Sequence, residues 1–300
     1  MKKTTFVLIF ALLACAASQA QLLYRISGKD LKNPSYILGT YHLAPASFAD
    51  SIPGMRAAFD ATEQVYGEVD MLETLKPENV AKMQEAMMLP EETTLSSLLT
   101  SDQLNRLNAL LREVMGVDLT NPAVAEQLDK VSPVALENTL MLMTYMKNIQ
   151  GLNPADLIDT YFQREAMKKN KDVKGFETTD FQMEVLYGAP LKEQITSLMC
   201  FVDHYQEGVE LAEFITAAYF SQDLEQLEDL NQEEQEGPCA GSPEDNDKLI
   251  YNRNDNWVKA MPKIMSEKPT LFVVGAFHLT GDRGVLRMLE NAGYKVEGVR

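Results

Sequence analysis

The sequence has little positive charge, and this limits the partners that it can bind. It contains 27 Lys and Arg against 44 Asp and Glu, which gives a formal net charge of −17. Binding to a phosphate backbone or to an anionic lipid surface requires a basic face. We therefore expect no nucleic-acid partner and no attraction to anionic membranes.

Several common catalytic motifs are absent from the sequence. It has no Gly-x-Ser-x-Gly nucleophile elbow, no phosphate-binding loop, no His-Glu-x-x-His helix and no Gly-x-Gly-x-x-Gly fingerprint. These absences weigh against a serine hydrolase of that class, a nucleotide enzyme and a zincin.

Long apolar runs are also missing beyond the N-terminal region. No later segment has 18 uncharged apolar residues in a row, so we expect no transmembrane segment in the mature chain. Residues 1–20 resemble a secretory signal peptide, because Lys2 and Lys3 precede an apolar run at 6–14 and small residues at 16–20. This pattern predicts an exported protein.

An alternative interpretation of the same region is a lipoprotein signal. Leu12-Leu13-Ala14-Cys15 approximates a lipobox, in which Cys15 would become a lipid anchor, although Leu13 fits that pattern poorly. Either signal predicts a protein that is periplasmic, secreted or anchored to the membrane at the cell envelope.

Cysteine is scarce in the expected mature chain, which keeps only Cys200 and Cys239. An oxidising compartment allows these two thiols to pair, and the bridge would join a helix to a loop. Two unrelated thiols are the alternative, because spacing along the chain does not test disulfide geometry.

Short apolar runs rich in β-branched and aromatic residues predict the strands. They occur at residues 22–26, 35–38, 64–69, 173–176, 270–274 and 294–299. The runs concentrate at the two ends of the chain, so we expect an α/β fold with an open central β-sheet built from N- and C-terminal segments. Residues 21–300 are predicted to form a single domain, with large helical insertions at about 76–172 and 180–250 that cap one rim of the sheet.

Local signals predict where helices begin within these insertions. Thr100 and Gln103 have the spacing of a capping box, and Ser132 before Pro133 is typical of a helix start. A further helix is expected from Pro154 to Lys168.

The later part of the chain is expected to hold two more helical segments. One runs from Asp180 to about Leu230 and gives way, within the acidic stretch 223–247, to an exposed loop. The other, from Asp245 to about Met265, carries Arg253. The acidic stretch is interpreted as a solvated face and not as a cation site.

Two of only three histidines lie in the same local pattern. Gly39-Thr40-Tyr41-His42 and Gly275-Ala276-Phe277-His278 each follow an apolar run. Glycine permits the turn or the close backbone approach that the end of a buried strand requires. Ligands in open α/β sheets bind outside the carboxyl ends of strands, so we expect His42 and His278 to meet in one site. His204 lacks this pattern and is predicted to be structural.

Two glutamates occupy comparable strand ends. Glu68 and Glu177 both follow apolar runs where the chain turns polar. Two imidazoles with one or two carboxylates suit Mn, Fe, Co or Zn, and a second carboxylate can act as a general base. A surface salt bridge or a place beside a helix N-cap is the alternative for each glutamate.

The chain resembles the TraB/GumN family, which includes the Tiki proteases. The similarity rests on residues 38–42, 66–70, 175–182, 253–254, 272–281 and 284–286. It implies a metal-dependent, peptidase-like site on a fold similar to that of erythromycin esterase and the haem-binding ChaN proteins.

The resemblance also implies roles for individual residues. His42 and His278 take the metal-ligand roles, and Glu68 or Glu177 supplies the acidic group. The motif backbone is formed by Gly39, Thr40 and Gly275.

Arg253 and Asn254 match the family's Arg-Asn pair and are predicted as catalytic residues. Arg253 would clamp a carboxylate or an oxyanion, with a salt bridge to an acidic neighbour as the alternative. Phe277 stands where many members have a small residue, which narrows the mouth of the expected site.

We therefore expect a metal-dependent hydrolase that acts on peptide or protein substrates. Its cofactor would be a divalent ion of Mn, Co, Zn or Fe. The alternative is a binding protein of the cell envelope that keeps the fold and sequesters a peptide, haem or another small ligand without turnover.

Overall fold

The structure is a computed structural model that describes residues 21–148, 153 and 155–300. The predicted signal peptide, with the possible lipid anchor at Cys15, lies outside the described residues. Pro154, the predicted start of a helix, lies outside them as well.

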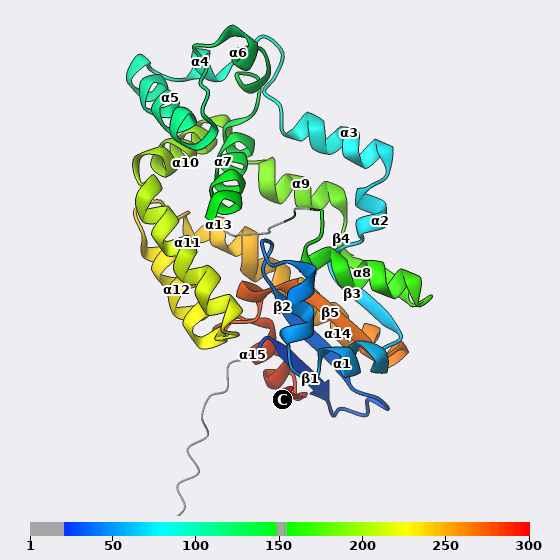
Figure 1. The fold of residues 1–300 in the computed structure, drawn as a ribbon. Helices are drawn as coiled ribbons and strands as arrows, with labels where there is room; N and C mark the ends of the chain where they lie inside the picture. Colours follow the sequence, from blue (N-terminus) through cyan, green and yellow to red (C-terminus); the bar gives the residue numbers. More distant parts are fainter. Residues whose placement is uncertain (1–20, 149–152, 154) are drawn as a thin grey trace, which may run out of the picture.

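A six-stranded sheet forms the centre of the fold (Figure 1). Its strands are β1 (Leu23–Ser27), β2 (Ser35–Thr40), β3 (Gln64–Val69), β4 (Asp172–Glu177), β5 (Thr270–Gly275) and β6 (Lys295–Gly298), in the order β4-β3-β5-β2-β1-β6. Each strand coincides within two residues with a predicted apolar run. The α/β sheet built from both ends of the chain is therefore confirmed.

Strand direction places four strand ends at one edge of the sheet. The strands β4, β3, β5 and β2 are parallel neighbours, whereas β1 runs antiparallel to both β2 and β6. Thr40 pairs with Gly275, and Val69 pairs with Glu177. The residues that follow these four strands therefore leave the sheet at the same carboxyl edge.

Two helical insertions begin at this edge. The first, between β3 and β4, contains α2 (Met71–Thr74), α3 (Pro77–Ala86), α4 (Leu95–Leu98), α5 (Ser101–Met115), α6 (Pro122–Leu128), α7 (Pro133–Asn148) and α8 (Ile158–Lys168). The second, between β4 and β5, contains α9 (Thr179–Tyr187), α10 (Leu191–Asp203), α11 (Tyr205–Phe220), α12 (Leu224–Glu236), α13 (Pro243–Asn246), a π-helical turn (Asp247–Tyr251) and α14 (Asn252–Glu267).

The remaining helices lie outside the two insertions, in the segments that connect the other strands. They are a 3₁₀ turn (Ala46–Ser51), α1 (Met55–Ala61), a 3₁₀ turn (Ala276–His278) and α15 (Val285–Asn291).

Local capping explains several of the helix boundaries. The predicted capping box of Thr100 and Gln103 forms at the start of α5, and α7 begins at Pro133 as expected. The helix predicted from Pro154 instead begins at Ile158, because Leu157 pairs with Pro45 in a β-bridge before α8 starts.

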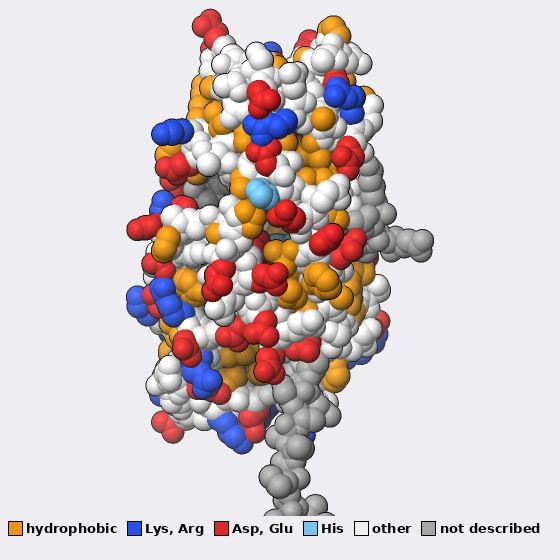
Figure 2. Space-filling model, turned by 90° about the vertical axis from the view of Figure 1, so that its left-hand side faces the viewer, with side chains coloured by type: hydrophobic (Ala, Val, Ile, Leu, Met, Phe, Trp, Pro, Cys, Tyr) orange, Lys and Arg blue, Asp and Glu red, His pale blue; other side chains and the backbone are white. Residues whose placement is uncertain are grey.

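Two other helix predictions are corrected. The acidic stretch does not leave its helix near Leu230, because α12 continues to Glu236 with Leu227 and Leu230 buried beneath its carboxylates. The single helix expected from Asp245 is divided by the π-helical turn, after which α14 starts. Figure 2 shows carboxylates spread over the face on which α11 and α12 lie, in agreement with a solvated acidic face.

Three apolar clusters hold these layers together. One lies on the side of the sheet covered by α1, α8 and α11, and a second lies under α14 and α15. The third contains no strand residue and joins α4, α5, α7 and α10, which Figure 1 shows far from β1. A disulfide joins Cys200 of α10 to Cys239 after α12 and links two parts of the second insertion. The sequence left this pairing open, and the structure contains it.

Candidate functional site

The two histidine motifs leave the sheet from neighbouring strands. Gly39 belongs to β2, and a Cβ there would lie 2.9 Å from Leu279 Cδ1 and 3.1 Å from Ala276 Cα. Glycine is therefore required at this position because the second motif packs directly against the first. Gly275 ends β5, and its N–H donates to Glu68 Oε1 at 2.8 Å.

Arg253 occupies the centre of the buried part of the site. Its Nε donates to Glu177 Oε1 at 2.8 Å, and its Nη2 donates to Glu177 Oε2 at 3.0 Å and to Glu68 Oε2 at 2.5 Å. Its Nη1 donates to the Leu249 carbonyl at 2.9 Å and lies 3.2 Å from His278 Nε2. A single guanidinium thus connects both predicted carboxylates to one predicted histidine.

Two further groups complete the hydrogen bonding of the two carboxylates. Glu177 Oε1 also accepts from the Trp257 indole N–H at 2.8 Å, and Gln182 Nε2 lies 3.4 Å from an oxygen of each glutamate. Burial by itself raises the pKa of Glu68, but the charges of its neighbours outweigh burial and lower the pKa to about 2. Those neighbours are His278, Arg253 and His42. Glu68 is therefore ionised at neutral pH.

His278 is buried and held in one tautomer. Asn254 Nδ2 donates to the backbone carbonyls of His278 at 3.2 Å and Arg283 at 2.9 Å, so its Oδ1 accepts from His278 Nδ1 at 2.7 Å. The proton is thereby placed on Nδ1, and Nε2 faces Arg253. Burial lowers the pKa of His278 to about 4, so the ring is neutral at neutral pH.

Asn254 was predicted as a catalytic residue, but the structure places it behind the His278 ring, away from the open part of the site. It is fully buried and lies on the Nδ1 side of the His278 ring, away from Nε2. Asn254 is therefore a positioning residue. Trp257 also restricts the positions of the His278 and Arg253 side chains, since the centre of its ring lies 4.4 Å from the centre of the His278 ring and 4.9 Å from the Arg253 guanidinium carbon.

His42 lies in the open part of the site, with its side chain 73% exposed. Its Nδ1 is 3.2 Å from Asp159 Oδ2, and the other oxygen of Asp159 accepts from the Thr40 hydroxyl. The charge and hydrogen bond of Asp159 raise the pKa of His42 to about 9, so this ring is protonated at neutral pH. The two histidines therefore carry opposite protonation states.

The exposed and the buried parts lie at the same edge of the sheet, because β2 and β5 are parallel neighbours and Thr40 pairs with Gly275. The charge of His42 also contributes to the pKa shifts of Glu68 and His278. His204, which was predicted to be structural, pairs with Glu207 on the surface at 2.8 Å.

Sequence reasoning missed two residues of this site and left a third without a role. Asp159 lies in the first turn of α8 and offered no local signal beyond an acidic residue near a helix start. Trp257 is the only tryptophan of the chain and lies four residues after Arg253, on the same face of α14. Gln182 belonged to a segment of family resemblance, but it was assigned no function.

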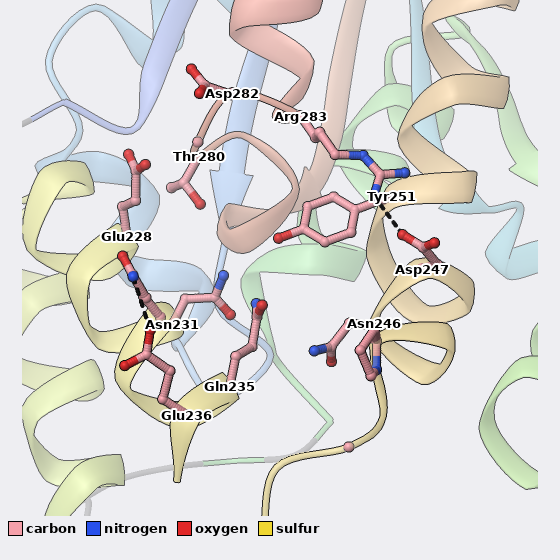
Figure 3. A pocket seen from close by; sticks show the side chains of 14 residues that line it. Glu228, Asn231, Gln235, Glu236, Asn246, Asp247, Tyr251, Thr280, Asp282 and Arg283 are labelled. Carbon is pink, nitrogen blue, oxygen red and sulfur yellow. Dashed lines mark hydrogen bonds and ion pairs between the residues drawn. The ribbon is translucent and has the colours of Figure 1, made fainter.

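A separate pocket of about 620 Å³ adjoins the second histidine motif (Figure 3). It lies between α12, the π-helical turn and the 280–283 segment, and Figure 3 shows Asn231, Gln235 and Tyr251 around it. Its wall is connected to the site through the bond from Asn254 to the Arg283 carbonyl. None of the four predicted metal ligands lines this pocket.

The residue types of a metal site are present, but their arrangement does not fit a metal ion. The atoms that would bind a metal ion, which are the carboxylate oxygens of Glu68 and Glu177 and Nε2 of His278, accept hydrogen bonds from the Arg253 guanidinium instead. His42 pairs with Asp159. Among the residues that the structure describes, no group of three or more His, Cys, Asp or Glu is placed to hold a metal. The assignment of these side chains as metal ligands stays a prediction.

The charges in the site predict a stability maximum near pH 6.5. His278 and Glu68 have pKa values below their ordinary values of 6.5 and 4.5, so stability is lost as pH falls from about 6.5 to 2. His42 has a raised pKa, so its contribution is lost as pH rises from 6.5 to about 9. Urea midpoints measured from pH 4 to 9 check this expectation, and His42→Ala should flatten the alkaline side. A midpoint that rises steadily to pH 9 contradicts it.

Comparison with known proteins agrees with the resemblance inferred from the motifs. The model of the TraB/PrgY/gumN family matches residues 22–298. Metalloprotease TIKI2 of Danio rerio is 24% identical in an alignment of 313 residues that covers 88% of this chain and 58% of that protein. The metalloprotease TIKI homolog of Nematostella vectensis is 22% identical over 311 residues, covering 89% and 65%. Metalloprotease TIKI1 of Homo sapiens is 24% identical over 314 residues, covering 88% and 59%.

These relatives are longer than this chain, which spans about three fifths of their length. No solved structure matches the chain. The family match extends over nearly all of the described residues and includes both histidine motifs, both glutamates and the Arg253-Asn254 pair. The chain belongs to the TraB/PrgY/gumN family.

Proposed function

We propose that this chain is a hydrolase of peptide bonds that acts on peptide or protein substrates at the cell envelope. The observation that carries the proposal is that a solvent-open His42–Asp159 pair and a buried, arginine-held carboxylate lie at the same edge of the sheet. The names of the similar metalloproteases support the class of reaction.

The site offers an acid and a base for hydrolysis. Protonated His42 is a proton donor. Ionised Glu68 is a weak base, because its pKa is about 2, and it accepts a proton from water only as the water becomes strongly acidic on adding to the carbonyl carbon. Glu68 is also the most accessible member of the buried group, with 15% of its side chain exposed against 6% for Glu177 and 5% for His278. A water molecule can therefore reach Glu68 more easily than the other two.

The proposed reaction balances its protons between these two groups. Glu68 accepts a proton from water as the water oxygen adds to the carbonyl carbon of the substrate. His42 gives its proton to the leaving nitrogen as the C–N bond breaks. Transfer of a proton from Glu68 to His42 through solvent restores the starting state.

A divalent metal ion was the expected cofactor. The names of the relatives indicate a metal in those proteins, and Mn, Co, Zn or Fe were expected here from the residue types. The arrangement around Arg253 does not fit such an ion, and the proposed reaction uses only side chains of this chain.

Export to the envelope belongs to the same proposal. The disulfide between Cys200 and Cys239 supports an oxidising compartment, where such bonds persist. None of the helices in the described part of the chain has the length and apolar content needed to cross a membrane. A signal peptide at residues 1–20, with or without lipid at Cys15, stays a prediction.

Cleavage of peptides by the purified mature chain tests the proposed function. We expect turnover of an unfolded protein or a quenched-fluorescence peptide library, with a pH profile whose alkaline limb lies near the His42 pKa of about 9. A parallel preparation of His42→Ala controls for host peptidases, and His204→Ala should behave as the wild type. Ligand binding without any turnover would favour the alternative, an envelope protein that sequesters a peptide or another small ligand.

A further inference from the structure

The buried acceptor atoms of the site converge on a cation that is part of the chain. Arg253 donates from all three guanidinium nitrogens to Glu68, Glu177 and His278 Nε2, at distances between 2.5 and 3.2 Å. The accepting atoms are carboxylate oxygens and an imidazole nitrogen. These are the atoms that bind divalent transition metals when the ion lies roughly 2.0–2.2 Å away.

The guanidinium and a metal ion cannot occupy this position together. Both are cations, and all three side chains that surround the position are buried or nearly buried. A charge can be placed in such surroundings only when it is compensated there. The two carboxylates supply that compensation, and Arg253 already uses both.

Arg253 is also held from behind, which opposes its displacement. Its Nη1 donates to the Leu249 carbonyl in the π-helical turn, and the Trp257 ring lies 4.9 Å from its Cζ. Only 6% of the Arg253 side chain is exposed. An incoming ion would have to break these contacts as well as the bonds to the carboxylates.

We propose that Arg253 is the resident cation of this site and excludes a divalent metal ion from Glu68, Glu177 and His278. These three side chains then form a latent metal site: in their present positions they are not placed to hold an ion, and they can draw together around one when the guanidinium is removed. The inference concerns the same site as the proposed function, but its test measures metal binding and not turnover, so either can fail without the other.

Arg253→Met tests the inference because it removes the cation and keeps an unbranched side chain. After dialysis against Mn²⁺ or Zn²⁺ and removal of the free ion, elemental analysis should find about one ion per chain in the variant and almost none in the wild type. The unfolding temperature of the variant should rise with metal concentration, whereas that of the wild type should not. Arg283→Met is the matched control, since Arg283 pairs with Asp247 on the surface, and it should behave as the wild type.

Two results would overturn the inference. One is a wild-type chain that retains one ion and loses it in Glu177→Gln or His278→Ala. The other is an Arg253→Met variant that retains no ion. If Arg253→Met does not fold alone, refolding with Mn²⁺ or Zn²⁺ decides the matter: rescue by the metal supports the latent site, and continued unfolding at every metal concentration rejects it.

Discussion

Arg253→Ala lowers the free energy of unfolding by about 3–5 kcal/mol in the absence of added metal, the largest stability loss that we expect from a single substitution in this chain. The reason is the loss of the guanidinium that pairs with both Glu68 and Glu177. Both carboxylates lie at the ends of neighbouring parallel strands with little exposed surface, and the hydrogen bonds that would remain, from Trp257 and Gly275, do not replace the lost positive charge. Urea denaturation near pH 6.5, followed by circular dichroism, measures the loss.

An exposed arginine provides the control for this measurement. Arg106 pairs with Asp102 and Asp203, but 40% of its side chain is exposed. Arg106→Ala should therefore cost at most about 1 kcal/mol, as is usual for surface ion pairs. In the double variant Arg253→Ala/Glu177→Gln, part of the lost stability should return because one uncompensated charge is gone. Equal costs for Arg253→Ala and Arg106→Ala would show that the buried network contributes no more than a surface pair.

His42→Ala lowers peptide turnover by about 10²–10⁴-fold, because it removes the proton donor of the proposed reaction. Asp159→Asn separates the charge of the neighbour from the imidazole itself. Without Asp159 the pKa of His42 should fall from about 9 toward its ordinary value of 6.5. At pH 7.5 only about one tenth of the rings would then be protonated, so turnover should drop about tenfold or more.

The pH profile distinguishes this role from a structural one. In Asp159→Asn the alkaline limb should move from near pH 9 toward pH 6.5, and turnover below pH 6 should approach that of the wild type. Asp156→Asn is the matched control, because Asp156 precedes the same helix and pairs with Arg164 on the surface. An alkaline limb that stays near pH 9 in Asp159→Asn would exclude His42 as the titrating acid.

The sheet was predictable because its signals are local. Each of the six strands is a short run of apolar residues that fills a buried layer, and the length of the run sets the strand within two residues. The carboxyl edge was predictable for a related reason. Parallel strands that end in Gly-x-x-His must deliver both histidines at the same edge once β2 and β5 pair, and the register Thr40 to Gly275 does this.

Helix boundaries and partners of the site depended on distant contacts. The start of α8 at Ile158 is determined by a bridge between Leu157 and Pro45, which no pattern around Pro154 reveals. Asp159 reaches Thr40 across 119 positions of the sequence, because α8 packs beside the edge of the sheet only in the folded chain. The pairing of Cys200 with Cys239 was equally open until the ends of α10 and α12 were placed.

The sequence by itself determined most of the charged and histidine residues of this site: two histidines after glycine turns, two strand-end glutamates and an arginine on a later helix. Only the tertiary structure decided how they are connected. Arg253 meets Glu177 across 76 positions and Glu68 across 185, and it takes the place expected for a metal ion. The physical reason is that residue type sets which charges are available, whereas burial and distance decide which charges compensate one another. Those two quantities exist only after β3, β4, β5 and α14 have packed together.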